Sequence, residues 1–326
     1  MHLLLWTLNG FIQGMGWPPC GRSLGHWYSL KERGSIFAVW NVSHNIGGGL
    51  AGIMAAYAAS YYGWEAAFYF PGAIALIGSA YLFWRLRDTP QSVGLPPIEE
   101  YKNDLSDIDY NENHERELTT RELFIDNILR NKYLWVVAFA NFFVYIVRYS
   151  MLDWGPMYLR EIKGATLHHG GIAILLIEFA GIPSTIIMGW LSDRLSGRRG
   201  MVSLFCLIPI LFAFVGIYLN PPGNLNFDMA MLVIIGLFIY PPVMLLGVAG
   251  IDLTSKKAVG TAAGFIGLFG YLGRSIQAKG FGWMVDHYGS LYDLKTGWDY
   301  VIFCILGANI AGIILLSFTW KMKPKV

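Results

Sequence analysis

Long apolar runs recur along the chain, each bounded by charged or turn-forming residues. Nine of them could cross a bilayer as helices, because about 20 residues at about 1.5 Å per residue span an apolar core of about 30 Å. The pattern predicts an all-α integral membrane protein with about nine transmembrane helices. The nine runs are Leu3–Gly21, Gly34–Tyr61, Ala66–Trp84, Tyr133–Leu159, Gly170–Leu191, Met201–Leu219, Met229–Leu253, Gly260–Met284 and Tyr300–Trp320.

Composition supports this class of protein. Hydrophobic residues make up 55% of the chain and charged residues 14%, with 38 glycines and 12 tryptophans, which departs from an ordinary soluble domain. The three cysteines, Cys20, Cys206 and Cys304, lie in apolar runs without the spacing of a disulfide framework or a zinc site. We expect them to pack as small apolar residues, and we expect no metal and no cofactor.

The distribution of Lys and Arg predicts the orientation. Of the 24 such residues, eighteen lie on one side of the predicted membrane and three on the other. Because cytoplasmic segments are enriched in Lys and Arg, we expect the long central segment and the C-terminus to be cytoplasmic. Met1 then lies outside, in an apolar run that lacks the basic region of a signal peptide. We therefore expect the chain to be a fragment that lacks preceding helices.

The central segment divides the predicted helices into two groups. It contains half of the 22 acidic residues, together with Pro90, Pro96 and Pro97, a composition typical of a solvated linker. We predict three parts: 1–86, the three-helix remainder of an N-terminal bundle; 87–132, a cytoplasmic linker; and 133–326, a six-helix C-terminal bundle.

Several predicted spans contain helix-breaking residues. Interrupted helices are expected where the backbone lines a cavity or bends during access changes. The residues concerned are Gly14, Gly16, Pro18 and Pro19 in the first span, Gly47 in the second, Pro183 in the fifth and Pro241–Pro242 in the seventh.

Arg148 lies near the centre of the predicted span Tyr133–Leu159. A lone charge at this depth costs at least a few kcal/mol, so such residues face a bundle interior or a watery cavity. A buried arginine needs an anionic partner, and its planar fork fits the oxygens of a phosphate or a carboxylate. The partner is either a substrate or a carboxylate of the protein, such as Asp153. The residue pattern alone leaves both interpretations open.

Other polar residues fall within the spans. Asn41 and His44 share one face of the second span, and Tyr145 lies one turn before Arg148. Histidine changes charge near neutral pH, as a phosphate monoester does, although His44 could instead only hydrogen-bond a neighbouring helix. The chain lacks a nucleophile beside a base and lacks metal ligands at short spacing. We therefore expect a binding site and no enzymatic activity.

Nine segments carry a resemblance that covers essentially the whole chain. They resemble the organophosphate:phosphate antiporter family of the major facilitator superfamily. The resemblance implies a twelve-helix bundle whose first three helices this sequence lacks. The segments are GMGWPPCGR, KERG, VWNVSHNIGGG, RDTPQSVGLPPIEEYKND, FVYIVRYSMLDWGPMYL, EFAGIP, GWLSDR, IYPPVML and KKAVGTAAGFIGLFGYLG.

The resemblance also implies a function. It implies uptake of glycerol 3-phosphate in exchange for inorganic phosphate by alternating access, and the alternatives are a hexose-phosphate antiporter or a membrane sensor of sugar phosphates that does not transport. The setting it implies is a bacterial inner membrane, with a multi-pass monomer in the lipid bilayer, a cytoplasmic C-terminus and no nucleic-acid partner.

Residue roles follow from the resemblance too. The substrate arginine of the second half falls on Arg148, and Arg274 and Lys279 have no match in the family pattern. We expect those two to reach the membrane surface with their long side chains or to pair with Asp286. The other implied residues are His44, Tyr145, Asn41, Trp17, Tyr240 and Tyr271 at the substrate, with Asp153 and Glu178 as carboxylates that exchange salt bridges.

Overall fold

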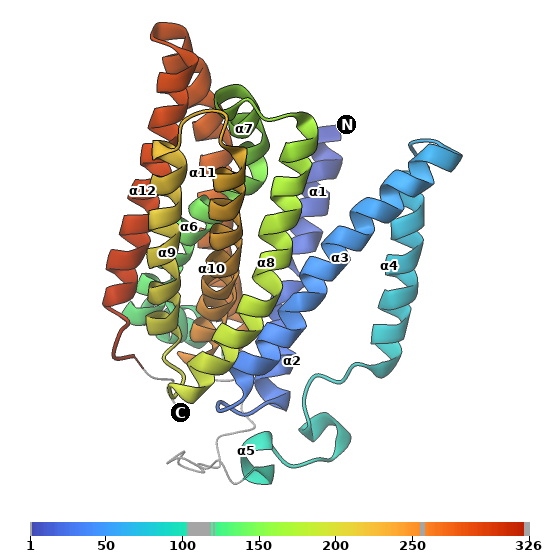
Figure 1. Cartoon of the computed structure of the whole chain (residues 1–326). Helices are drawn as coiled ribbons and strands as arrows, with labels where there is room; N and C mark the ends of the chain where they lie inside the picture. The colour runs from blue at the N-terminus through green and yellow to red at the C-terminus, as the bar shows by residue number, and fades with distance from the viewer. Residues whose placement is uncertain (1, 103–118, 120, 255–257, 323–326) are drawn as a thin grey trace.

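The computed structural model describes residues 2–102, 119, 121–254 and 258–322, and every regular element within these ranges is helical. The long helices stand side by side, roughly along one direction (Figure 1). The elements are α1 (His2–Gly14), α2 (Trp17–Trp27), α3 (Arg33–Tyr62), α4 (Ala66–Arg85), η1 (Gln91–Val93), α5 (Ile98–Tyr101), η3 (Glu122–Leu129), α6 (Lys132–Tyr149), η4 (Ser150–Trp154), α7 (Gly155–Lys163), α8 (Leu167–Arg194), α9 (Arg199–Leu219), α10 (Leu225–Asp252), α11 (Val259–Leu291) and α12 (Leu294–Ser317).

Six segments among the described residues are long and apolar enough to cross a membrane, where the sequence predicts nine. The six are Ala66–Arg85, Lys132–Lys163, Ile172–Arg194, Arg199–Leu219, Leu225–Asp252 and Leu294–Ser317. The first predicted span is divided into α1 and α2, each too short to cross alone. Helices α3 and α11 have 30 and 33 residues, but glycines and polar residues lower their hydropathy.

Only one of the predicted helix interruptions is present. The break between α1 and α2 lies beside Gly16, and Pro18 and Pro19 occupy the first turn of α2, where a missing N–H leaves no helical bond unmade. Helix α3 continues through Gly47. Helices α8 and α10 also continue through their internal prolines, so the expectation of breaks there is wrong.

An interruption that the sequence did not predict follows Arg148. The residues Ser150–Trp154 form a π-helical turn, η4, between α6 and α7. Pro156 stands just beyond it and lacks the N–H that would close a regular helical bond four residues back. Wide turns of this kind occur often at functional sites.

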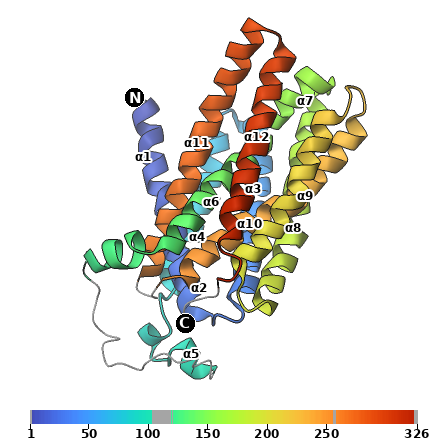
Figure 2. The same ribbon diagram turned by 90° about the vertical axis from the view of Figure 1, so that its left-hand side faces the viewer.

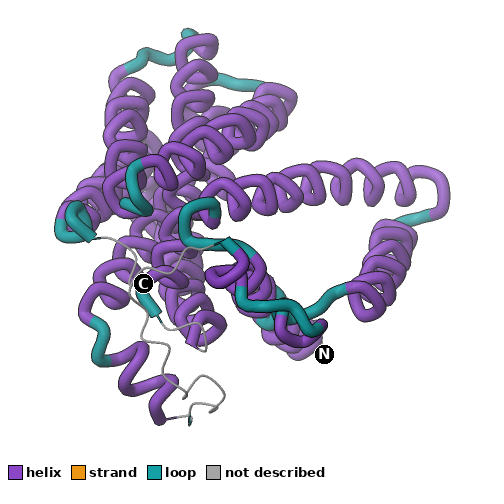
Figure 3. The backbone as a smooth tube through the Cα atoms, turned by 90° about the horizontal axis from the view of Figure 1, so that it is seen from below, coloured by secondary structure: helices purple, strands orange, loops and turns teal. Residues whose placement is uncertain are grey.

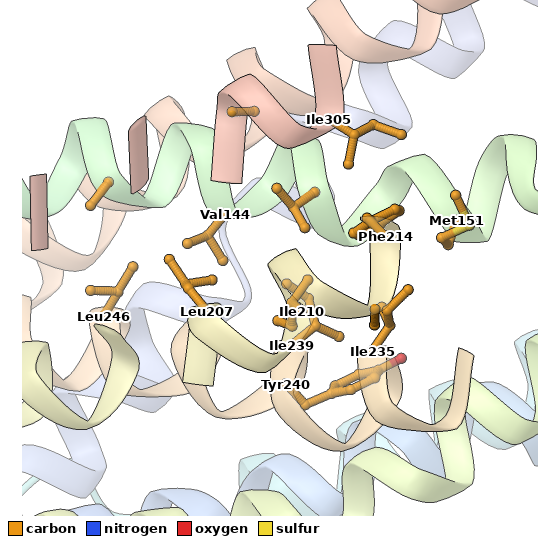
Figure 4. Packing of buried hydrophobic residues seen from close by; sticks show 14 of the residues in the cluster. Val144, Met151, Leu207, Ile210, Phe214, Ile235, Ile239, Tyr240, Leu246 and Ile305 are labelled. Atoms are coloured by element: carbon orange, nitrogen blue, oxygen red, sulfur yellow. The ribbon is translucent and has the colours of Figure 1, made fainter. Parts of the chain in front are cut away.

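Helices α6 to α12 form one bundle around a continuous apolar core. Helix α10 packs most extensively against α8 and α9, and α6 packs against α11 and α12. Side chains of α6, α9, α10 and α12 meet between the ribbons, and Tyr240 lies at the edge of this group (Figure 4). The core of this bundle therefore fixes α6 and α10 relative to each other.

Glycines allow two of these helix pairs to approach backbone to backbone. A Cβ on Gly236 of α10 would lie 2.5 Å from the carbonyl oxygen of Ile177 on α8, and one on Gly273 of α11 would lie 2.3 Å from the carbonyl oxygen of Phe142 on α6. Small residues at such crossings are typical of packed membrane helices.

Helices α1 to α4 are arranged around the side of this bundle. Helix α3 packs against α8, and α2 packs against α11, while the hairpin of α3 and α4 projects outward when viewed along the helices (Figure 3). A second apolar cluster joins α3 to α9 and α10 and includes Phe37, Cys206 and Val248. The other two cysteines are unpaired as well, Cys20 half-buried and Cys304 exposed.

The predicted linker lies at one end of the helices. Its described part contains η1, α5 and η3, and residues 103–118 and 120 lie outside the described ranges. Helix α5 and the end of α12 are at this end, whereas α1 begins at the opposite end (Figures 1 and 2). The described part of the linker and the end of α12 therefore lie at the same end of the helices (Figures 1 and 2).

Gly236→Ala tests the close approach of α10 and α8. Overpacking costs about 1–3 kcal/mol, so we expect a lower thermal midpoint for the purified protein in detergent. Gly307→Ala is the control, because its added Cβ meets nothing within 4 Å and alanine favours a helix by up to about 1 kcal/mol. Equal midpoints for the two variants would contradict the assigned packing.

Candidate functional site

Arg148 lies in the last turn of α6 with its side chain turned into the protein, 9% exposed. Its guanidinium carbon is 4.7 Å from the ring centre of Tyr240 and 5.2 Å from that of Tyr149. Its Nε is buried without a hydrogen-bond partner, and no ion pair within the described ranges includes it. Two aromatic faces stabilise the cation. Glu178 lies within electrostatic range of Arg148, but it forms no ion pair with it within the described part of the chain.

A glycine on α8 permits the contact between Tyr240 and Arg148. Tyr240 of α10 is 1% exposed, and a Cβ on Gly181 would come within 2.3 Å of its ring. The Tyr240 hydroxyl is buried without a hydrogen bond, although it lies near Arg148 and Glu178. The ring is therefore held by packing, and its hydroxyl is left able to donate.

Further tyrosines extend the site along α6 and α11. The ring of Tyr145 lies 5.5 Å from that of Tyr149 and 5.8 Å from that of Tyr271. Gly270 of α11 faces the Tyr145 ring so closely that an added Cβ would lie 3.0 Å from it. Tyr145 and Tyr271 both lie within electrostatic range of Arg148.

His44 of α3 also lies near Arg148. It lies on an exposed side of α3, within electrostatic range of both Arg148 and Glu178. Glu178 is partly buried on α8, the helix against which α3 packs. A titratable imidazole and a carboxylate therefore face the region around the unpaired arginine.

Two predicted site residues are not placed against Arg148. Trp17 forms an edge contact with Trp40, with ring centres 6.3 Å apart, and lies against Gly247 of α10, whose added Cβ would be 3.0 Å from the indole. Trp17 therefore belongs to the second apolar cluster. No hydrogen bond, ion pair or ring contact of the described residues joins Trp17 or Asn41 to Arg148.

Asp153 pairs with an arginine other than Arg148. One of its oxygens lies 3.5 Å from Nη2 of Arg274, so the suggested pair of Arg148 with Asp153 is not formed. The expected pair of Arg274 with Asp286 is also wrong, because twelve residues along one helix separate them by about 18 Å. The π-helical turn η4 carries Asp153 next to α11, and Lys279 is exposed on α11.

Comparison with known proteins places the chain in a family. The sequence pattern described as Major Facilitator Superfamily matches residues 1–278. The chain belongs to the major facilitator superfamily. It is 45% identical to a glycerol-3-phosphate transporter of Bacillus subtilis over 317 residues, which is 96% of this chain and 69% of that protein.

Other superfamily members extend the comparison. A glycerol-3-phosphate transporter of Haemophilus influenzae is 40% identical, over 95% of this chain and 70% of the relative. A probable hexose phosphate transport protein of Chlamydia pneumoniae is 39% identical, over 100% of this chain and 72% of that protein. The solved structure of the proton:xylose symporter XylE has the same fold, with a TM-score of 0.66 at 14% identity over 93% of this chain and 67% of that one.

This superfamily member also contains a charged network that the sequence did not reveal. At the end of the helices near the predicted linker, Arg33 of α3 donates to Asp252 at 2.7 Å, and Arg199 donates to the same carboxylate at 3.2 Å and to Asp193. Asp193 also accepts from the backbone N–H groups of the two residues after Arg33, at 3.0 and 2.7 Å. The network thus ties the first turn of α3 to α8, α9 and α10.

Only weak signals of this network exist in the sequence. Asp193 and Arg199 belong to the segment GWLSDRLSGRR, and Arg33 belongs to KERG. However, Arg33 and Asp252 are 219 residues apart. A pairing over that separation depends on the fold and could not be predicted from local spacing.

Asp252→Asn tests the strength of this network. It leaves two buried arginines short of a counter-ion, and breaking such a pair costs about 3–5 kcal/mol. Glu32→Gln is the matched control, because its 2.6 Å pair with Lys102 is partly exposed and such pairs contribute about 0–1 kcal/mol. Thermal unfolding in detergent should show a large decrease in the midpoint temperature for Asp252→Asn only. Equal decreases for the two variants would contradict the assigned network.

Proposed function

We propose that this protein takes up glycerol 3-phosphate in exchange for inorganic phosphate across a bacterial plasma membrane. The observation that carries the proposal is the buried guanidinium of Arg148, which has two tyrosine rings against it and no ion pair among the described residues. A membrane-buried charge of this kind marks a substrate pathway. The missing counter-ion is then the phosphate group of the substrate.

The chemistry of the site fits a phosphate monoester. A guanidinium binds two phosphate oxygens at once and stays protonated at any physiological pH. The Nε of Arg148 and the hydroxyl of Tyr240 are buried donors without partners, and Tyr145 and Tyr271 supply further hydroxyls nearby. His44 can adjust its charge to that of the ligand.

The proposed transport uses alternating access between two groups of helices, residues 1–86 and 133–326. The buried network of Arg33, Asp193, Arg199 and Asp252 fastens α3 to the second group at one end. We place this end in the cytoplasm, on the charge distribution of the sequence. Opening there requires the network to break, and rearrangement of salt bridges that involve His44, Asp153 or Glu178 on substrate binding would favour that step.

Two relatives define the alternatives. Hexose phosphate is a second candidate substrate, because the Chlamydia pneumoniae relative is a probable hexose phosphate transport protein. A relative in Escherichia coli, 36% identical over 99% of this chain and 72% of that protein, is a membrane sensor protein. We propose transport by a monomer, and uptake distinguishes a carrier from a sensor.

Arg148→Lys tests the role of the guanidinium. Lysine keeps the charge but loses the two-oxygen contact, and one charge-assisted hydrogen bond is worth about 1.5–3 kcal/mol. We expect phosphate affinity and phosphate exchange to fall about 10-fold to 100-fold. Arg160→Lys is the control, since Arg160 is exposed on α7. Binding is measured with the purified protein and exchange in proteoliposomes, and unchanged values for Arg148→Lys would refute the proposal.

Competition measurements test the substrate class. Unlabelled glycerol 3-phosphate should displace radiolabelled phosphate at lower concentration than glucose 6-phosphate does. The reverse order would favour the hexose phosphate alternative. Binding without any exchange in proteoliposomes would favour a sensor.

A further inference from the structure

Arg274 is a second guanidinium beside the proposed site. It lies on α11, with its guanidinium carbon 4.0 Å from the ring centre of Tyr149. Arg148 lies 5.2 Å from the centre of the same ring, so the two cations are within about 9 Å of each other, by addition of these distances. The ring of Tyr149 thus contacts both guanidinium groups, and both arginines also lie within electrostatic range of Tyr145 and Tyr271. At these distances both charges would act on an anion bound beside Arg148.

The counter-ion of Arg274 is weakly held. The shortest contact of Asp153 with Arg274 is 3.5 Å, and the two side chains are 29% and 42% exposed. The distance exceeds that of a charge-assisted hydrogen bond, about 2.7–2.9 Å, and exposed ion pairs contribute little to stability. In contrast, Arg33 contacts Asp252 at 2.7 Å in a buried pair. Asp153 can therefore be displaced by a ligand at little cost.

We infer that Arg274 is a further cation of the anion site and that it makes the site select doubly charged phosphate over singly charged ligands of the same shape. This inference rests on the proposed function. An arriving dianion would contact Arg148 and take the place of Asp153 beside Arg274. Arg274 then adds a positive charge beside a ligand that has two negative charges.

The Coulomb energy between Arg274 and a bound anion predicts a measurable difference between ligands of different charge. The interaction energy of Arg274 with a ligand scales with the ligand charge. Removing the charge of Arg274 should therefore lower the affinity for a dianion by the square of the factor by which it lowers the affinity for a monoanion. Glycerol 3-phosphate is mainly a dianion at pH 7.5, because its second ionisation lies near pH 6. Glycerol 3-sulfate has the same shape and one charge. We expect Arg274→Gln to weaken the binding of glycerol 3-sulfate about 5-fold and the binding of glycerol 3-phosphate about 25-fold.

The test measures dissociation constants of both ligands for the purified protein at pH 7.5. Arg160→Gln is the matched control, because this arginine is also exposed and has a long ion pair, 3.8 Å from Glu161. Unchanged phosphate affinity of Arg274→Gln would overturn the inference, and equal fold-losses for the two ligands would reduce Arg274 to a packing role. Failure of the unsubstituted protein to bind either ligand would overturn the proposed function as well.

Asp153→Asn gives a second test with the opposite sign. It removes the negative charge beside Arg274, so we expect tighter binding, by about 5-fold for the sulfate and about 25-fold for the phosphate. Misfolding does not tighten binding, so this result would not be confused with damage to the protein. Weaker or unchanged phosphate binding by Asp153→Asn would contradict the displacement of Asp153.

Discussion

The burial of the Arg148 guanidinium without an ion pair among the described residues is the constraint on which the proposed site depends. A charged side chain inside a membrane protein is costly unless an anion or water compensates it. At Arg148 the protein supplies the rings of Tyr149 and Tyr240, which stabilise a cation without neutralising it. We propose that this arrangement keeps the arginine ready to bind an anion and that a bound ligand completes it.

The other buried arginines of the described chain show that the fold can pair such charges with carboxylates. Arg33 and Arg199 share Asp252, and Arg199 also reaches Asp193. Each of these contacts joins helices that are distant in sequence and fixes one end of the bundle. Buried arginine therefore has two roles in this protein. Arg33 and Arg199 join helices through ion pairs, whereas Arg148, which has no ion pair among the described residues, is the proposed ligand site.

Part of the candidate site could be predicted from the sequence, because Arg148 interrupts an apolar run and Tyr145 lies one turn before it. The roles of His44, Tyr240 and Tyr271, which lie on other helices, were implied by the family resemblance. The break between α1 and α2 was also visible, in a cluster of glycine and proline. Helix α10 passes through Pro241–Pro242, however, because tertiary packing overrides local breaking tendency. The pair of Asp153 with Arg274 depends on the π-helical turn η4 and on the packing of α6 against α11, which no local pattern reveals.

A structure of the protein with glycerol 3-phosphate bound would show whether Arg148 holds the phosphate group. We expect phosphate oxygens at about 2.7–2.9 Å from the guanidinium nitrogens of Arg148, with the tyrosine rings still against that side chain. A phosphate bound elsewhere, with Arg148 unchanged between Tyr149 and Tyr240, would contradict it.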